Sequence, residues 1–251
     1  MNPPLLIVAA LKEEVRDLLK NCEIDRCIHL YPARIWEGEF RGSPLTMLVT
    51  GLGAERMRQG LQKAFVHIQP ERAIHIGFAG STSPLVTTGK LVLADRVVDA
   101  TSGAQYPADA DVLASAKNLA DAIGGIVTVD RLISDPMEKA ALGSEHHCLA
   151  VDMESAAVAA FCKERGLKCC IARSILDGLQ VEIPEFETQA ASGEPGVTDV
   201  LRWMIRHPRE MLEIPRLQYL ASQARNRLTQ FVTEFLRNES TIVSSPDRPN
   251  V

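Results

Sequence analysis

Three acidic residues in the sequence each follow a short apolar run of strand-like composition, and they could act as acids or bases. These residues are Glu14, Glu154 and Asp177. In open α/β sheets, ligands bind in the crevice beyond the carboxyl ends of the strands. The sequence therefore predicts that the three carboxylates, which follow three separate strands, share one crevice.

Helix geometry separates Glu14 from its neighbour Glu13. At about 100° per residue, Leu11, Val15 and Leu18 form one apolar stripe, and Glu14 falls on the edge of that stripe. Glu13 points away from it. We therefore expect the carboxylate of Glu14 to be partly buried and that of Glu13 to be solvated.

Each of the three acids also has a simpler structural explanation. Glu14 and Glu154 fall in the first turns of predicted helices, where a negative charge stabilises the helix dipole. Asp177 precedes Gly178, and an Asp-Gly pair after a strand is typical of a turn. The convergence of three acids on one crevice favours chemistry over these separate explanations.

A trio of carboxylates suits cleavage of the bond between a ribose and its base. That cleavage creates positive character on the sugar and negative charge on the departing base. A carboxylic acid that its surroundings keep protonated can neutralise the base. A second carboxylate can activate water, and a third can hold the ribose hydroxyls.

The elements that must position these acids alternate between strand and helix over the first two thirds of the chain. Strands are predicted at 5–10, 33–40, 45–50, 73–78, 90–98, 125–129, 148–151 and 168–174, and helices at 11–20, 54–66, 110–123, 136–143 and 153–165. The residues Arg41-Gly42-Ser43 predict a hairpin between the second and third strands. We therefore expect an α/β fold, a single domain of three layers in which a central mixed twisted sheet is flanked by helices.

One catalytic domain is expected to cover residues 1–237. The acidic segment 180–195 predicts a loop, and two helical segments are predicted after it, at 198–207 and 208–237. These helices carry an apolar side and a group of arginines. They are expected to pack on the domain or on a second subunit with the arginines solvated, or, alternatively, to form a basic amphipathic lid at a membrane surface. Residues 238–251 are polar and predict a disordered tail.

The composition excludes several classes of protein. The chain has 251 residues and a net charge of −5 with its basic residues spread out, so a nucleic acid is not an expected partner. No apolar run approaches the roughly 20 residues of a transmembrane helix, and no signal peptide is expected. The six cysteines form no CxxC pair, which predicts reduced thiols and a cytoplasmic protein. No metal is expected, because the cysteines form no CxxC pair and adjacent residues such as His146 and His147 rarely bind one metal together. No organic cofactor is expected, because the sequence lacks a Walker motif and a complete dinucleotide-binding motif.

Five short segments then carry a resemblance to a known family. They are Ala9–Val15, Thr50–Gly53, Gly77–Gly80, Val151–Ala156 and Arg173–Asp177. In this order they resemble the nucleoside phosphorylase/nucleosidase superfamily, and especially its methylthioadenosine/S-adenosylhomocysteine nucleosidases. The resemblance covers roughly residues 5–180, and it implies a homodimer that acts on a small-molecule purine nucleoside.

The resemblance implies a role for each acid. Glu14 is expected to activate the attacking water, Glu154 to bind the ribose 2′ and 3′ hydroxyls, and Asp177 to protonate N7 of the base. An aspartate at position 177, where enzymes for 6-oxopurines tend to carry asparagine, favours adenine as the base. The other expected substrate contacts are Leu52, Phe78, Ala79, Gly80, Leu132, Ile133, Asp152 and Met153.

Hydrolysis is preferred to phosphorolysis as the reaction. The phosphorylases carry an arginine just before the glycine-rich turn, where this sequence has His75, and a neutral histidine is a poor phosphate ligand. We expect His75 to be a hydrogen-bonded strand histidine instead. The carboxylate of Glu14 would also repel phosphate. A phosphorylase and a non-catalytic nucleoside-binding module remain as alternatives.

The 5′ substituent of the nucleoside is also open. A 5′-substituted adenosine of the methylthioadenosine or S-adenosylhomocysteine type is the preferred substrate. Phe78 in the glycine-rich turn and the segment Leu201–Leu228 also resemble the phosphorylase-like enzymes of hopanoid biosynthesis. That branch implies a lipid-linked substrate, an adenosylated hopane, from which adenine would be released.

Overall fold

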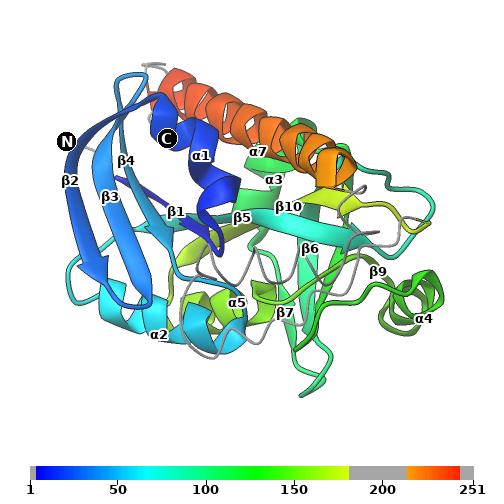
Figure 1. Ribbon diagram of the computed structural model, residues 1–251. Helices are drawn as coiled ribbons and strands as arrows, with labels where there is room; N and C mark the ends of the chain where they lie inside the picture. Colours follow the sequence, from blue (N-terminus) through cyan, green and yellow to red (C-terminus); the bar gives the residue numbers. More distant parts are fainter. Residues whose placement is uncertain (1–3, 181–213, 244–251) are drawn as a thin grey trace, which may run out of the picture.

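A mixed ten-stranded sheet forms the centre of the molecule, and helices cover both of its faces (Figure 1). The structure, a computed structural model, describes residues 4–180 and 214–243. Its strands are β1 (Leu5–Ala9), β2 (Cys22–Leu30), β3 (Ala33–Phe40), β4 (Ser43–Val49), β5 (Arg72–Ser81), β6 (Leu91–Asp99), β7 (Gln105–Pro107), β8 (Ala122–Thr128), β9 (Cys148–Asp152) and β10 (Lys168–Asp177). Its helices are α1 (Lys12–Lys20), α2 (Ala54–Ala64), α3 (Ala110–Ala116), the 3₁₀ turn η1 (Lys117–Leu119), α4 (Pro136–His146), α5 (Ser155–Arg165) and α7 (Ile214–Val243). The predicted three-layer α/β architecture is confirmed.

Strand β5 organises the sheet because it pairs with three other strands. It runs parallel to β1 and β10 and antiparallel to β9. Because β10 also pairs with β6, the strands β5, β9, β8, β6 and β10 form a closed ring of paired strands. The strands β1, β4, β3 and β2 extend from β5 on the other side.

Alternation along β1 shows how the sheet separates two cores. Leu5, Ile7 and Ala9 pack into a cluster with α1, α3 and α7, whereas Leu6 and Val8 pack into a second cluster with α2 and α5. Successive side chains of a strand point to opposite faces of a sheet. A strand that is apolar at every position is therefore buried on both sides.

The hairpin was predicted correctly, and its edge strand was missed. β3 and β4 pair antiparallel across Arg41 and Gly42, which both have positive φ (53° and 80°), as a two-residue type I′ turn requires. The prediction omitted β2, an edge strand whose residues are mostly exposed and include several charges. It also omitted the three-residue β7. Neither strand has the apolar alternation on which the prediction relied.

One predicted helix is too long. The helix expected at 110–123 ends as α3 and η1 at Leu119, and β8 begins at Ala122. The backbone N–H of Asp121 donates to Leu91 O, and the backbone N–H of Leu91 donates to a carboxylate oxygen of Asp121. These bonds start the parallel pairing of β8 with β6, so sheet formation overrides the helical pattern.

The C-terminal helix α7 packs on the domain, as the first of the two expectations for this segment stated. Five of its buried side chains belong to the same cluster as side chains of α1 and β1; they are Leu228, Phe231, Val232, Phe235 and Leu236. The expectation of solvated arginines is wrong for two of them, because Arg225 binds Asp17 and Arg227 binds Asp121. The helix continues to Val243, so residues 238–243 are helical and not part of a disordered tail. The helix expected at 198–207 and the residues 244–251 lie outside the described residues.

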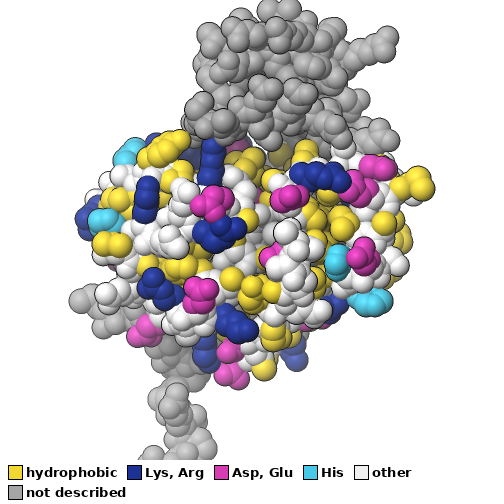
Figure 2. All heavy atoms as spheres, turned by 90° about the horizontal axis from the view of Figure 1, so that it is seen from below, with side chains coloured by type: hydrophobic (Ala, Val, Ile, Leu, Met, Phe, Trp, Pro, Cys, Tyr) yellow, Lys and Arg dark blue, Asp and Glu magenta, His cyan; other side chains and the backbone are white. Residues whose placement is uncertain are grey.

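The surface carries charges of both signs. On the face shown in Figure 2, lysines and arginines are interspersed with acidic side chains and apolar surface. Within residues 4–180 and 214–243, no helix is both long enough and apolar enough to cross a membrane.

Candidate active site

The three acids lie at the ends of strands that meet along β5. Glu14 is in the first turn of the helix that follows β1, and Asp177 is the last residue of β10, which places it opposite Gly80 of β5. Glu154 follows β9, which runs antiparallel to β5. Its chain therefore approaches β5 from the direction opposite to that of β1 and β10. The mixed sheet brings the acids to one strand nonetheless.

Glu14 is fixed by backbone donors. The backbone N–H groups of Ala10 and Leu11 donate to its Oε2 at 2.9 and 2.8 Å, and that of Phe78 donates to its Oε1 at 2.8 Å. The side chain is buried, whereas that of Glu13 is 55% exposed, so the predicted distinction between the two is confirmed. Burial raises the pKa of Glu14, against the opposing effects of Arg173 and the three N–H donors.

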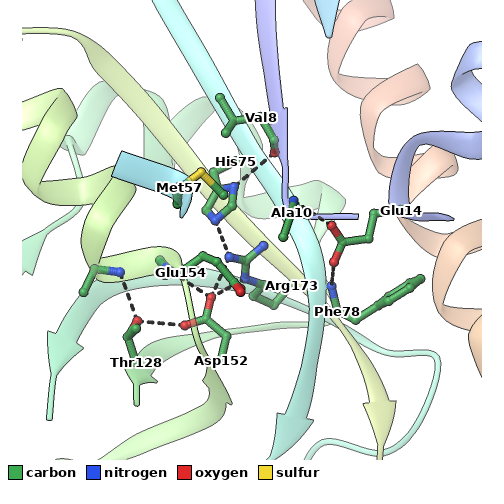
Figure 3. A network of polar contacts seen from close by, with 12 residues as sticks. Val8, Ala10, Glu14, Met57, His75, Phe78, Thr128, Asp152, Glu154 and Arg173 are labelled. Carbon is green, nitrogen blue, oxygen red and sulfur yellow. Dashed lines mark hydrogen bonds and ion pairs between the residues drawn. The ribbon is translucent and has the colours of Figure 1, made fainter. Parts of the chain in front are cut away.

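A buried guanidinium lies at the centre of the site (Figure 3). Arg173 is 1% exposed, and its Nε donates to Oδ2 of Asp152 at 2.7 Å. Its Nη2 contacts Nε2 of His75, whose Nδ1 lies 3.0 Å from the carbonyl oxygen of Val8. Burial and the charge of Arg173 lower the pKa of His75 well below its usual value, so the ring is neutral. The expectation of a hydrogen-bonded strand histidine is confirmed, and the neutral ring orients Arg173.

Asp152 supports this guanidinium. Besides Arg173, its carboxylate accepts from the Thr128 hydroxyl at 2.7 Å and from the backbone N–H of Ser155 at 3.0 Å. These contacts engage both oxygens. Asp152, which we expected to bind substrate, is therefore turned toward Arg173, and the structure places it as an anchor for that side chain.

Glu154, like Glu14, lies close enough to Arg173 for the positive charge to lower its pKa. It is 5% exposed, and its Oε1 accepts from the backbone N–H of Gly53 at 2.7 Å. Burial and the neighbouring Asp152 raise its pKa to about 7, while Arg173 and the Gly53 N–H act in the opposite direction. The glycine turn that precedes α2 therefore holds this carboxylate in place.

Asp177 is paired with a lysine that the sequence analysis did not single out. The Nζ of Lys139, a residue of α4 with no exposed surface, contacts Oδ2 of Asp177. Burial raises the pKa of Asp177 to about 6, and Lys139 opposes that rise. A carboxyl with a pKa near neutrality can both hold and release a proton under physiological conditions.

Two glycines of β5 allow these side chains to approach the strand. A methyl group on Gly77 would lie 2.1 Å from Nη1 of Arg173 and 2.9 Å from Oε1 of Glu14. One on Gly80 would lie 3.2 Å from Oδ2 of Asp177. The glycine-rich sequence of β5 thus makes room for the polar groups.

The remaining expected contacts divide into exposed and buried residues. Leu52 and Leu132 are 42% and 44% exposed, as apolar surfaces for a ligand would be. Ile133 is buried in a cluster with Val98 and Val127. The structure places the other four along β5 and after β9, with Ala79 buried and the rest partly buried; the four are Phe78, Ala79, Gly80 and Met153.

Arg173 and Lys139 are the two residues of the site that sequence reasoning missed. Arg173 interrupts an apolar strand, and a charge within a buried strand is a usable signal. Lys139 lies in a helix that also carries Glu138 and Glu145, where nothing in the sequence distinguishes a buried lysine from a solvated one.

Comparison with known proteins identifies a family and several similar chains. The family model described as "Phosphorylase superfamily" matches residues 4–202. A 5′-methylthioadenosine/S-adenosylhomocysteine nucleosidase from Geobacillus thermodenitrificans is 28% identical over 68% of this chain and 82% of its own length. One from a Marinomonas species is 29% identical over 59% of this chain and 74% of its own.

Solved structures share the fold. The nucleosidase from Neisseria meningitidis, in complex with methylthio-immucillin-A, has a TM-score of 0.72 at 17% identity and covers 94% of this chain and 99% of its own. The one from Colwellia psychrerythraea, in complex with adenine, has a TM-score of 0.72 at 18% identity and covers 95% and 96%. With its fold, its carboxylates along β5 and the match over residues 4–202, the chain belongs to the phosphorylase superfamily.

Proposed function

We propose that this protein is a nucleosidase that hydrolyses the N-glycosidic bond of a 5′-substituted adenosine and releases adenine. The observation that carries the proposal is the group of three buried carboxylates, Glu14, Glu154 and Asp177, which lie along β5 with raised pKa values. The curated relatives, which are named as methylthioadenosine/S-adenosylhomocysteine nucleosidases, support the same reaction.

Asp177 acts as the general acid. As the bond between C1′ and N9 breaks, its electrons move to the base, and the carboxylic acid of Asp177 gives its proton to N7. Adenine then leaves as a neutral molecule. The pKa of about 6 fits this role, because the acid keeps a proton in part of the molecules at neutral pH and is still strong enough to donate it.

Glu14 acts as the base. Its carboxylate takes a proton from water while the water oxygen attacks C1′, so the products are adenine and the free sugar. Three backbone N–H groups fix the orientation of the carboxylate, and such fixed geometry lowers the entropic cost of the attack. Burial raises the pKa of Glu14 and so makes it a stronger base.

Glu154 binds the ribose, and Arg173 balances the negative charges. The ribose hydroxyls donate to the Glu154 carboxylate, which is held from the other side by the N–H of Gly53. Arg173 lies close enough to Glu14 and Glu154 to lower the pKa of both. Without this cation, two buried carboxylates could not be ionised together.

Apolar residues contact the base and the 5′ substituent. Phe78, Leu52, Leu132 and Met153 supply this surface, and Leu52 and Leu132 remain substantially exposed. Such a surface accepts an uncharged thioether chain without a buried polar partner.

Adenine release tests the proposal. Methylthioadenosine, S-adenosylhomocysteine and adenosine are each incubated with the protein, with and without phosphate, and adenine is quantified by chromatography. We expect rapid release from the two thio-nucleosides with no phosphate requirement. Strict phosphate dependence would identify a phosphorylase instead, and binding without turnover would identify a nucleoside-binding module. Silence with all three nucleosides would direct the test to a lipid-linked adenosine.

We also propose a homodimer that resides in the cytoplasm. Leu85 and Met137, which are 83% and 81% exposed, offer apolar surface for a second subunit. All six cysteines are free thiols, as a reducing compartment favours. Sedimentation analysis is expected to give twice the monomer mass, and cell fractionation to place the protein with the cytoplasmic enzymes.

A further inference from the structure

Lys139, which is paired with Asp177, is a fully buried charged side chain of the site to which the proposed mechanism gives no role. The lysine has no exposed surface, and its ammonium contacts Oδ2 of the carboxylate. A lysine is almost never fully buried unless it is paired, because removing its charge from water is costly. A solvated lysine would be the ordinary outcome on a helix at the edge of the domain.

The packing of α4 explains why this lysine is directed inward. Lys139 and Gly143 are its two buried residues, and they lie one turn apart on the same face of the helix. A methyl group on Gly143 would lie 2.4 Å from the carbonyl oxygen of Thr82, so the glycine lets α4 approach the chain just after β5. That close approach places Lys139 beside the end of β10.

Lys139 is also the charge that controls Asp177. Gly80 of β5 lies opposite Asp177, and a methyl group on Gly80 would meet both Oδ2 of Asp177 and the side chain of Val151 in β9. The next residue after Asp177, Gly178, donates its backbone N–H to the Thr88 hydroxyl. None of these groups titrates. Among the described residues, only α4 supplies a charged side chain hydrogen-bonded to this carboxylate. The other three acids, Glu14, Asp152 and Glu154, are arranged around Arg173 instead.

We propose that Lys139 is a positioning residue for the general acid: its ammonium holds Oδ2 of Asp177, orients the carboxyl and stabilises the carboxylate that remains after proton transfer. The inference rests on the proposed function, since it assigns Asp177 the proton that goes to N7. In that step the proton leaves Asp177 for N7, and Lys139 keeps its own proton throughout. The lysine makes Asp177 a stronger acid at the cost of a smaller protonated fraction at neutral pH.

Because Lys139 raises the acid strength of Asp177 and lowers its protonated fraction, a Lys139→Met variant should show a specific pH dependence. Without the ammonium, the pKa of Asp177 rises, so the acid stays protonated to higher pH but donates its proton less readily. We expect kcat for adenine release to fall about tenfold or more at pH 5.5, where both enzymes carry protonated Asp177. The deficit shrinks as the pH increases, because the high-pH decline of the variant moves upward by about one unit or more. We expect KM to change little, since the proposed role of Lys139 acts through Asp177.

Three further variants separate this role from a structural one. Lys139→Arg keeps a cation and is expected to retain activity within about fivefold. Lys139→Gln keeps a hydrogen-bond donor without the charge, and it takes the place of Lys139→Met if that variant does not fold. Lys117→Met removes a lysine from the exposed 3₁₀ turn η1 and is expected to match the wild-type protein at every pH.

A direct titration keeps the inference distinct from the proposed function. Carbon-13 NMR of protein labelled at its aspartate carboxyls gives the pKa of Asp177, whose signal is identified by its loss in Asp177→Asn. An upward shift in folded Lys139→Met, together with the pH-dependent deficit, supports the inference. An unchanged Asp177 titration in the folded variant overturns it, whatever the activity. If the wild-type protein releases no adenine, the proposed function fails, and the titration by itself decides whether Lys139 controls Asp177.

Discussion

A single methyl group on Gly77 should disable this site. The β-carbon of a Gly77→Ala variant would lie 2.1 Å from Nη1 of Arg173, whereas non-bonded atoms need about 3.5 Å. The guanidinium would have to move by more than about 1 Å. It cannot do so freely, because it is buried and its Nε is bonded to Asp152. A movement of that size breaks a hydrogen bond whose usable range is about 0.5 Å.

The magnitude follows from two limits. Overpacking alone typically costs about 1–3 kcal/mol, and loss of one partner of a buried ion pair costs about 3–5 kcal/mol. We expect the free energy of unfolding to fall by about 3 kcal/mol, between these limits, because the displaced Arg173 keeps part of its contact with Asp152. Displacement of the cation that balances Glu14 and Glu154 should also reduce kcat/KM by about 100-fold.

Urea unfolding followed by circular dichroism, together with the adenine-release assay, tests this prediction. Gly103→Ala is the matched control, since a methyl group there meets no atom within 4 Å and φ is 71°. It should cost only the left-handed backbone penalty of about 1 kcal/mol and leave activity unchanged. In an Arg173→Met background, Gly77→Ala should cost less than in the wild-type protein, because the clash with the guanidinium is gone and only the 2.9 Å contact with Oε1 of Glu14 remains. Wild-type stability and activity in Gly77→Ala would refute the packing of Arg173 on β5.

Three other substitutions test separate parts of the argument. Asp177→Asn removes the general acid, and we expect kcat/KM for adenine release to fall about 10²- to 10⁴-fold in a protein that still unfolds cooperatively; near-normal turnover would exclude Asp177 as the acid. Burial raises the pKa of Glu154 from about 4.5 to about 7, so the folded state holds a proton that the unfolded chain releases in this window, and the free energy of unfolding falls as the pH rises through it. Glu154→Gln lacks this loss and should be more stable than the wild-type protein at pH 8, by up to about 3 kcal/mol, with the difference vanishing near pH 4.5 in urea titrations. Phe231→Ala empties a fully buried position of α7 and should cost about 3–5 kcal/mol in the same assay, whereas a loss below about 1 kcal/mol would show that α7 does not belong to the core.

Local sequence patterns predicted the features of the structure that depend on a single helix, strand or turn. The 3.6-residue period of α1 placed Glu14 in the core and Glu13 in solvent, and both positions are confirmed. The residues Arg41-Gly42-Ser43 between two strand-like runs predicted the hairpin, and the structure has positive φ at Arg41 and Gly42 in its turn. The ends of the apolar runs located the three acids. In each case the signal depends on residues within about one helical turn or one strand.

Other features of the fold depend on how the strands pair in the sheet, which local sequence patterns do not predict. The direction of β9 depends on its partner β5, because hydrogen bonds between strands far apart in sequence set it. The end of α3 depends on the pairing of β8 with β6. The polar edge strand β2 forms because β3 offers it a ladder, although its own residues show little apolar alternation.

The charges of the site show most clearly which features the sequence determines and which depend on the tertiary structure. The sequence by itself determined which carboxylates follow strands and, by resemblance, what they could do together. Only the tertiary structure decided that Arg173 lies among Glu14, Asp152 and Glu154, and that Lys139 lies against Asp177. The reason is physical, since the pKa of a carboxyl is set by burial and by nearby charges, and the cation that lowers the pKa of each of Glu14, Glu154 and Asp177 comes from a residue at least 19 positions away in the sequence.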